Sequence, residues 1–325
     1  MIKHTMLALL SAGGIVVCST VGANAQTLSF TPVGSMTGPA DMVKAQGAYA
    51  YIAGGKTLSI VDISNPAEPK RTAAYTFPSA IWGFTVAGAT VYVAADLYGL
   101  AILDVSNAAA PTLRGSLKTP GQAKNVAVFG TKALVADHVA GIDMVDVSTM
   151  AKPTLIGSFF VDGFAKDVVT VGSLAYAVDM PTGFYVFDLS KPNSSEPVSR
   201  LTLANVASGY AQLDVSDTSS PTRRLAVVAG GGPLQVYDVS NVLAPIHATT
   251  YRVPGGAQRV SLKGTRAYVA AGREGLQVVD LTTPSTPTIL GAYKTAPPAR
   301  DVAVANSLVF VVVGNDEVLI LRQTR

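Results

Sequence analysis

The sequence contains few side chains that could act as an acid or a base near neutral pH. Three histidines occur among its 325 residues, and only His138 has a carboxylate, Asp137, directly beside it. The candidate catalytic residues are His138 and Asp137, with His138 as the candidate general base because a histidine titrates close to neutral pH. The competing interpretation, a loop histidine without a chemical role, stays open. No Gly-x-Ser-x-Gly motif occurs, which argues against the nucleophile elbow of serine hydrolases.

A second group of candidates follows a recurring Ala-x-x-Val pattern that predicts the first strand of a repeated unit. The residues between the alanine and the valine differ from copy to copy and are mostly polar, as in a concave ligand site. The alternative is that these polar residues form salt bridges with one another around the central channel, in which Asp167 pairs with Lys124 or Lys166. By the same argument Asp301 pairs with Arg259 or Arg300. The candidate ligand-binding residues are Trp82, Lys124, Lys166, Asp167, Arg259, Arg300 and Asp301.

Trp82 is the only tryptophan and occupies one of these variable positions. An aromatic ring at the mouth of a cavity can stack on a sugar or another planar ligand. The same ring can instead fill the cavity as part of the core. The sequence leaves both roles open.

Three aspartates follow the expected second strands of successive units: Asp96, Asp137 and Asp179. We expect them to form an acidic side of the cavity, opposite a basic side that contains Arg259, Arg273 and Arg300. Ordinary turn chemistry, in which aspartate is common, is the alternative. A hard cation needs several oxygens within about 2.3–2.6 Å. Neighbouring units hold these carboxylates too far apart for that, so neither a metal nor a cofactor is expected.

One phrase, an apolar strand that ends in Asp-x-Ser or Asp-x-Thr, recurs with a period of about 42 residues. Its aspartates are Asp62, Asp104, Asp146, Asp188, Asp238 and Asp280. Each precedes a turn whose backbone N–H groups can bind the carboxylate, which favours a structural role. Short β-branched strands between Gly and Pro turns fill each period and predict four strands per unit. Such units must stack radially to bury both faces, so the sequence predicts an all-β, seven-bladed β-propeller with four-stranded antiparallel blades.

The two ends of the chain complement each other. The last copy, Val318–Gln323, stops after its third strand and has Arg322 in place of the aspartate, and Leu28–Met36 resembles a fourth strand. We expect the N-terminal strand to complete the last blade, because this removes the open edges of the array. Residues 26–325 then form a single propeller domain, with an insertion at Ser216–Arg224.

Residues 1–25 have the pattern of a cleaved signal peptide, with an apolar stretch at Met6–Val17 and a small-residue site at Ala23-Asn24-Ala25. The stretch is too short for a membrane anchor, so we expect a periplasmic, secreted or cell-surface protein without a transmembrane segment. Lipidation of Cys18 is an alternative that Val17 disfavours. Cleavage removes this only cysteine and leaves two histidines, too few for a three-histidine metal centre. A formal net charge of +3 without basic runs argues against nucleic acid as a partner.

The repeated phrase, as in Leu58-Ser-Ile-Val-Asp-Ile-Ser64, resembles the repeats of the LVIVD-repeat family of bacterial and archaeal β-propellers. The resemblance extends from about Leu28 to Gln323. It implies an exported or surface-associated propeller, in a family whose members mostly lack an assigned activity. We therefore expect a binding or scaffold module that presents its central channel to a protein, a glycan or a small molecule. The alternative is a hydrolase, lyase or isomerase that acts at the channel mouth on a small substrate, anionic or not.

Overall fold

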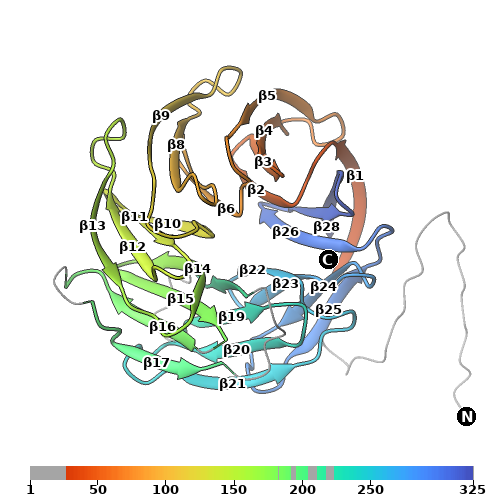
Figure 1. Cartoon of the computed structure of the whole chain (residues 1–325). Helices are drawn as coiled ribbons and strands as arrows, with labels where there is room; N and C mark the ends of the chain where they lie inside the picture. Colours follow the sequence, from red (N-terminus) through yellow and green to blue (C-terminus); the bar gives the residue numbers. More distant parts are fainter. Residues whose placement is uncertain (1–26, 182, 192–194, 204–210, 217–222, 325) are drawn as a thin grey trace, which may run out of the picture.

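The chain forms a ring of seven four-stranded antiparallel sheets around a central channel (Figure 1). The computed structural model describes residues 27–181, 183–191, 195–203, 211–216 and 223–324, and strands are the regular elements of these ranges. The first strand of each blade is the innermost and the fourth is the outermost. The predicted seven-bladed β-propeller is confirmed. The described ranges contain no apolar helix of membrane-spanning length.

We number the blades in chain order, and the seventh is shared between the two ends of the chain. Blade 1 contains β2 (Met42–Gln46), β3 (Tyr49–Gly54), β4 (Thr57–Asp62) and β5 (Lys70–Thr76), and blade 2 contains β6 (Gly83–Ala87), β7 (Thr90–Ala94), β8 (Leu100–Asp104) and β9 (Thr112–Leu117). Blade 3 contains β10 (Asn125–Phe129), β11 (Lys132–Ala136), β12 (Ile142–Asp146) and β13 (Thr154–Phe159), and blade 4 contains β14 (Phe164–Val171), β15 (Leu174–Met180), β16 (Gly183–Asp188) and β17 (Ser199–Thr202). Blade 5 contains β18 (Gln212–Val215), β19 (Leu225–Ala229), β20 (Leu234–Asp238) and β21 (Ile246–Tyr251), and blade 6 contains β22 (Arg259–Lys263), β23 (Arg266–Ala270), β24 (Leu276–Asp280) and β25 (Thr288–Tyr293). Blade 7 contains β26 (Ala299–Ala305), β27 (Leu308–Val313), β28 (Glu317–Thr324) and β1 (Ser29–Thr37).

The repeated aspartates close the turns that follow the third strands. In each of the six copies the carboxylate accepts a hydrogen bond from the backbone N–H two residues later, at 2.8–3.0 Å. In blade 2, the hydrogen bonds from Ser106 hold the pKa of Asp104 below its usual value. The structural role predicted for these aspartates is confirmed, and none of the six belongs to the channel.

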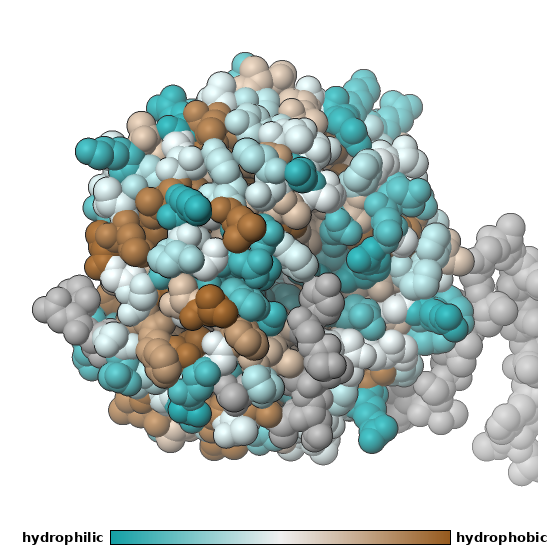
Figure 2. Space-filling model, in the orientation of Figure 1, coloured by the Kyte–Doolittle hydropathy of each residue, from teal (hydrophilic) through white to brown (hydrophobic). Residues whose placement is uncertain are grey.

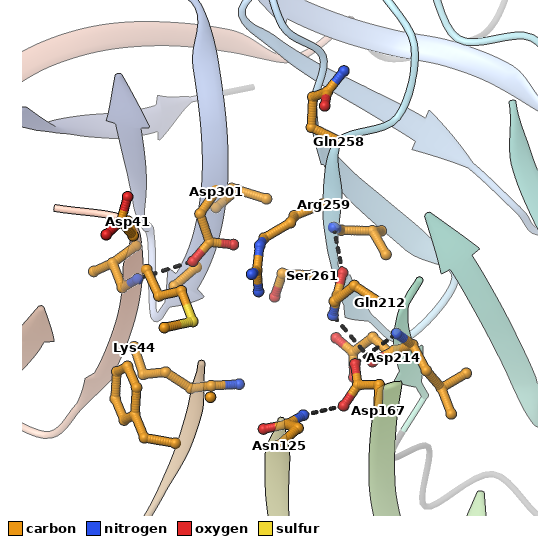
Figure 3. Close-up of a pocket in the computed structure, with 18 of the residues that line it drawn as sticks. Asp41, Lys44, Asn125, Asp167, Gln212, Asp214, Gln258, Arg259, Ser261 and Asp301 are labelled. Carbon is orange, nitrogen blue, oxygen red and sulfur yellow. Dashed lines mark hydrogen bonds between the residues drawn. The ribbon is translucent and has the colours of Figure 1, made fainter. Parts of the chain in front are cut away.

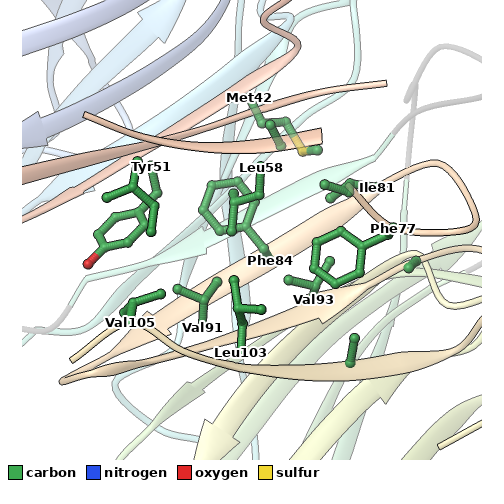
Figure 4. Close-up of a cluster of buried hydrophobic side chains, with 14 of the residues drawn as sticks. Met42, Tyr51, Leu58, Phe77, Ile81, Phe84, Val91, Val93, Leu103 and Val105 are labelled. Atoms are coloured by element: carbon green, nitrogen blue, oxygen red, sulfur yellow. The ribbon is translucent and has the colours of Figure 1, made fainter. Parts of the chain in front are cut away.

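Apolar side chains fill the space between neighbouring blades. Between blades 1 and 2, Leu58 of β4 lies in one buried cluster with Phe84 of β6 and Leu103 of β8 (Figure 4). Successive side chains of a strand point to opposite faces, so every residue of β7 is buried against one neighbouring blade or the other. Burial of one such side chain contributes about 1.5–3 kcal/mol. Each blade therefore depends on both of its neighbours for stability.

The ring is closed by the chain's own ends. Strand β1 pairs antiparallel along the whole length of β28, as the sequence predicted. A side chain adds to this closure, because Asp301 of blade 7 accepts a hydrogen bond from the backbone N–H of Val43 in blade 1 at 2.9 Å. The expected signal peptide, residues 1–25, lies outside the described residues, as does most of the insertion predicted at Ser216–Arg224.

Candidate functional site

The first strands of the seven blades surround a cavity of about 1620 Å³ on the axis of the ring. Hydrophilic side chains gather around the hollow at the centre of the face shown in Figure 2. We call the end of the channel where the first strands begin the mouth, and Trp82, Lys124 and Lys166 lie there. Ligand pockets typically measure about 300–1,000 Å³. The cavity is therefore wide enough for a small molecule or for a segment of another protein.

Trp82 lies at the mouth on blade 2, directly before β6, and it is 38% exposed. The ammonium group of Lys124 lies 4.2 Å from the centre of its ring and 3.3 Å from Asp96 Oδ1. Lys124 is thus held between a carboxylate and an aromatic face. The next residue, Gly83, has no room for a side chain, which would collide with Asn125 of blade 3. Trp82 lines the cavity and is partly exposed, so its ring is not part of the buried core.

His138 and Phe164 form a stacked pair at the mouth, on blades 3 and 4. Their ring centroids lie 4.6 Å apart, and the ring planes differ by 11°. His138 has a φ of +54°, a left-handed conformation that is uncommon for residues other than glycine. Burial, followed by the positive charges of Lys166 and Lys124, lowers the pKa of His138. Its imidazole is therefore neutral at pH 7.

Asp137 does not occupy the position expected from the sequence. It is fully buried, and it accepts hydrogen bonds from Thr119 Oγ1 at 2.7 Å and from the backbone N–H of Gly121 at 2.5 Å. Asp143, which is also fully buried, lies beside it, and burial raises the pKa of both carboxyl groups. Asp137 therefore holds the linker into blade 3 and does not orient the imidazole of His138. Asp137, a candidate catalytic residue in the sequence, thus has its carboxyl group buried and not exposed at the mouth.

The expected acidic side of the mouth is absent from the described part of blades 2 to 4. Asp96 is structurally equivalent to His138, since both have a left-handed backbone and both bridge to the start of the next blade. Asp137 and Asp179 correspond to each other instead, and both are fully buried and bind the backbone N–H of a linker glycine. Of the three aspartates only Asp96 approaches the mouth, where Lys124 neutralises it. The alignment of the blades in the sequence was therefore wrong by one position, because Asp137 and Asp179 correspond to the residue that precedes Asp96.

Two predicted ligand-binding residues connect blades across the channel wall (Figure 3). Asp167 of β14 accepts a hydrogen bond from the backbone N–H of Leu213 in blade 5 at 2.8 Å, and another from the side-chain amide of Asn125 in blade 3. Burial raises its pKa to about 6. Asp301 holds Val43 of blade 1 in the same way, and burial raises its pKa too. Both carboxyl groups line the cavity, but their oxygen atoms are engaged within the protein.

The predicted salt bridges form with other partners. Lys124 pairs with Asp96, and Arg300 lies 3.7 Å from Asp41. Within the described residues, neither Asp167 nor Asp301 makes a salt bridge. The reason is burial, since each of these two carboxyl groups already accepts a hydrogen bond from a neighbouring blade.

Three further residues line the deeper channel and were missed in the sequence. Lys44 of β2, Asp214 of β18 and Ser261 of β22 lie two positions after a variable residue and face the cavity (Figure 3). The two-residue period of a strand would have identified them. Lys44 and Arg259 lower the pKa of the buried carboxyl of Asp301 against the larger opposing effect of burial. Lys44 acts on Asp167 and Asp214 in the same way, so cations and carboxyls in the deep channel compensate one another.

The blade 3 and 4 side of the mouth is basic, opposite to the expectation. Lys166 is half-buried, and burial together with the charge of Lys124 lowers its pKa. No carboxylate of the described chain lies within salt-bridge distance of it, whereas Lys124 and Arg300 both have one. No cluster of three metal-ligating side chains occurs among the residues that the structure describes. The arrangement is suited to hold an anionic group beside an aromatic or apolar surface.

Comparison with known proteins adds the family. A family model described as LVIVD repeat matches residues 37–76, 82–119, 120–161 and 254–295, which form blades 1, 2, 3 and 6. No curated protein matches the chain. Two similar solved structures are "Crystal Structure of Mitotic Checkpoint Complex" (TM-score 0.72, 11% identity, 95% of this chain and 99% of that chain) and the Cps50 (Swd1) β-propeller domain of Myceliophteria thermophila (TM-score 0.70, 12% identity, 90% and 99%). At such identities the likeness shows the fold alone. The chain is therefore an LVIVD-repeat protein that folds as a closed seven-bladed β-propeller.

Proposed function

We propose that the protein is a binding module that takes a ligand or a partner protein at the mouth of its central channel. The observation that carries the proposal is the cavity of about 1620 Å³, whose lining differs from blade to blade although the blades themselves repeat. Ligand sites are concave and combine apolar surface with a few convergent polar groups. Trp82, Lys124 and Lys166 provide both on one side of the mouth.

Two further observations support this proposal. One of the similar propellers is titled as part of a multiprotein complex, which favours a role in protein interaction by analogy of fold. The signal-peptide pattern of residues 1–25 favours a location in the periplasm, at the cell surface or outside the cell. A rigid closed ring is suited to such a role, because the binding residues are already held in place before the ligand arrives.

The sole tryptophan provides a direct test of the proposal. Trp82 is the only tryptophan of the sequence and lies at the mouth, so its fluorescence reports on that site alone. We expect a ligand from a collection of organic acids, sugars and peptides to change this fluorescence saturably. The same ligand should raise the melting temperature, since ligand at a hundred times its Kd stabilises a folded protein by about 2.7 kcal/mol.

The control for this test is Trp82→Phe. This variant should lose the fluorescence signal and keep a rise in melting temperature, because the lysines remain in place. A ligand that raises the melting temperature of the native chain and leaves Trp82 fluorescence unchanged binds elsewhere, and that result would reject the mouth as the site.

One observation favours the alternative of an enzyme. The pKa of His138 is lowered, so its neutral imidazole could accept a proton at neutral pH. Its neighbour Asp137 is bound to Thr119 and Gly121 and does not orient the ring, which favours binding over catalysis. A hydrolase, lyase or isomerase reaction at the mouth should disappear in His138→Gln while the Trp82 titration is unchanged. Full turnover by that variant would exclude His138 as the base.

A further inference from the structure

Exposed apolar side chains gather on the face that carries the mouth, on blades 2 to 4. These are Trp82, Leu97, Val139, Phe160 and Phe164, with exposed fractions from 38% to 68%. Leu97 lies in the turn between β7 and β8, Val139 lies in the turn between β11 and β12, and Phe160 directly follows β13. The antiparallel pairing brings these turns and the starts of the first strands to the same face. We call these five residues the apolar rim.

The fold does not require apolar residues at these turns. Asp96, His138 and Gly272 are equivalent, since each has a left-handed backbone and each bridges to the next blade. The residue that follows is Leu97 in blade 2, Val139 in blade 3 and Arg273 in blade 6. All three are exposed, so an arginine satisfies the turn as well as a leucine or a valine. Clustered apolar side chains exposed on a surface mark sites of protein contact.

Positive charge accompanies the apolar rim. The basic residues of this region are Lys118, Lys124, Lys166 and Arg200. Two carboxylates oppose them, and each is already paired, Asp96 with Lys124 and Asp162 with Arg200. Lys166 is half-buried beside the stacked pair of Phe164 and His138, and no carboxylate of the described chain neutralises it. The region therefore has an excess of positive charge at its centre.

The deeper channel does not offer a comparable anion site. There the cations Lys44 and Arg259 face the buried carboxyl groups of Asp167, Asp214 and Asp301. An anion entering this layer would meet carboxyl groups as well as cations. The uncompensated charge thus lies at the mouth, next to the apolar rim, and not along the channel axis.

We infer that the apolar rim and Lys166 together form a docking surface for an acidic segment of a partner protein, with a carboxylate side chain at Lys166 and apolar side chains on the rim. This inference rests on the proposed function and specifies its partner. Interfaces combine a patch of aromatic and aliphatic residues with charges complementary to those of the partner. A protein segment fits better than an acidic sugar, because Leu97 and Val139 are aliphatic and Lys124 already covers the ring of Trp82.

A selection from random 12-residue displayed peptides on the immobilised full-length chain tests the inference. We expect the bound peptides to be enriched in Asp or Glu next to Leu, Val, Met or Phe. The affinity of a selected peptide is then measured from Trp82 fluorescence, with free glucuronate and phosphate as separate probes. Weak or absent binding of these two anions is expected, because they lack the apolar part of the contact.

Charge reversal at the centre of the surface provides the matched comparison. Lys166→Glu should weaken the selected peptide by about tenfold or more, and the same peptide with its acidic residue changed to lysine should regain affinity for this variant. Arg322→Glu changes the net charge equally on β28, at the opposite face, and should leave affinity unchanged. Val139→Gln should weaken binding about threefold or more through lost apolar contact. Melting temperatures of the three variants show that each is folded.

The outcomes separate this inference from the proposed function. Peptides without acidic residues, or equal losses in Lys166→Glu and Arg322→Glu, would overturn the inference and leave a binding module with a different ligand. Tight binding of glucuronate that responds to Lys166→Glu would also overturn it, in favour of an acidic sugar. If no peptide, sugar or acid changes Trp82 fluorescence or the melting temperature, both proposals fall.

Discussion

Replacing Asp143 with asparagine should stabilise the protein at neutral pH and leave its stability unchanged at pH 4. Asp137 and Asp143 are both fully buried side by side, and within the described residues Asp143 Oδ2 receives no hydrogen bond. A proton on one of the two carboxyl groups supplies the missing hydrogen bond, so the folded chain retains that proton. An asparagine at position 143 carries an NH₂ group that donates the same bond without a charge.

The size of the effect follows from the pKa. Burial raises the pKa of Asp143 from 3.8 to about 6, which corresponds to about 3 kcal/mol at about 1.36 kcal/mol per pKa unit. Between pH 4 and pH 6 the unfolded chain releases this proton while the folded chain retains it. The contribution of this carboxyl group to the free energy of unfolding therefore falls as the pH rises through this window. Asp143→Asn has no carboxyl group to ionise at this position. The free energy of unfolding of the variant should therefore exceed that of the native chain by near zero at pH 4 and by about 3 kcal/mol at pH 7.

Urea denaturation of both proteins at pH 4, 5, 6 and 7 measures this difference. The buried carboxyl groups that line the channel, Asp167, Asp214 and Asp301, are the same in both chains, so their contributions cancel. Asp104→Asn is the control with the opposite pH dependence. Hydrogen bonds from Ser106 lower the pKa of Asp104, so its carboxylate stabilises the folded chain above pH 4 and the variant should lose that stabilisation. A stability difference between Asp143→Asn and the native chain that is independent of pH, or that is larger at pH 4 than at pH 7, would refute the shared proton.

Three further changes test how the ring is held. Gly83→Ala should lower the free energy of unfolding by about 1–3 kcal/mol, because the added methyl group collides with blade 3. Gly157→Ala is the control, since its methyl group meets only ordinary contacts, and equal urea midpoints for the two variants would contradict the prediction. His138→Asn should change the free energy of unfolding by less than about 1 kcal/mol, whereas His138→Val should lower it by more, because valine resists the left-handed backbone. Equal melting temperatures of the two variants would disprove backbone strain at position 138. Deleting residues 27–37 should cause aggregation, because β28 loses its partner; a monodisperse monomer in gel filtration would refute the closure.

The site was only partly predictable from the sequence. Trp82, Lys124 and Lys166 were identified because the variable positions of the first strands stand out against a repeating background, and they do line the cavity. Asp167 and Asp301 were identified by the same rule, but their carboxyl groups bind backbone N–H groups of the next blade. Nothing in a single blade's sequence shows which polar side chain its neighbour will bind.

The alignment of turns was the weakest step. Asp96 and Asp137 look equivalent in the sequence because both follow an alanine-rich second strand. The bridges to the next blade show that Asp96 corresponds to His138 and that Asp137 lies one position earlier, pointing inward. A shift of one residue in a strand moves a side chain to the opposite face, which is why the expected acidic side of the mouth became a basic one.

The sequence by itself determined the architecture of this protein. A phrase repeated every 42 residues or so, with short alternating strands, permits only units that stack in a ring. The matching ends of the chain then specify closure, and β1 with β28 confirms it. Only the tertiary structure decided which charges remain uncompensated at the mouth. The reason is that pairing partners such as Val43 and Asp301 lie on different blades, far apart in the sequence, so no local pattern links them.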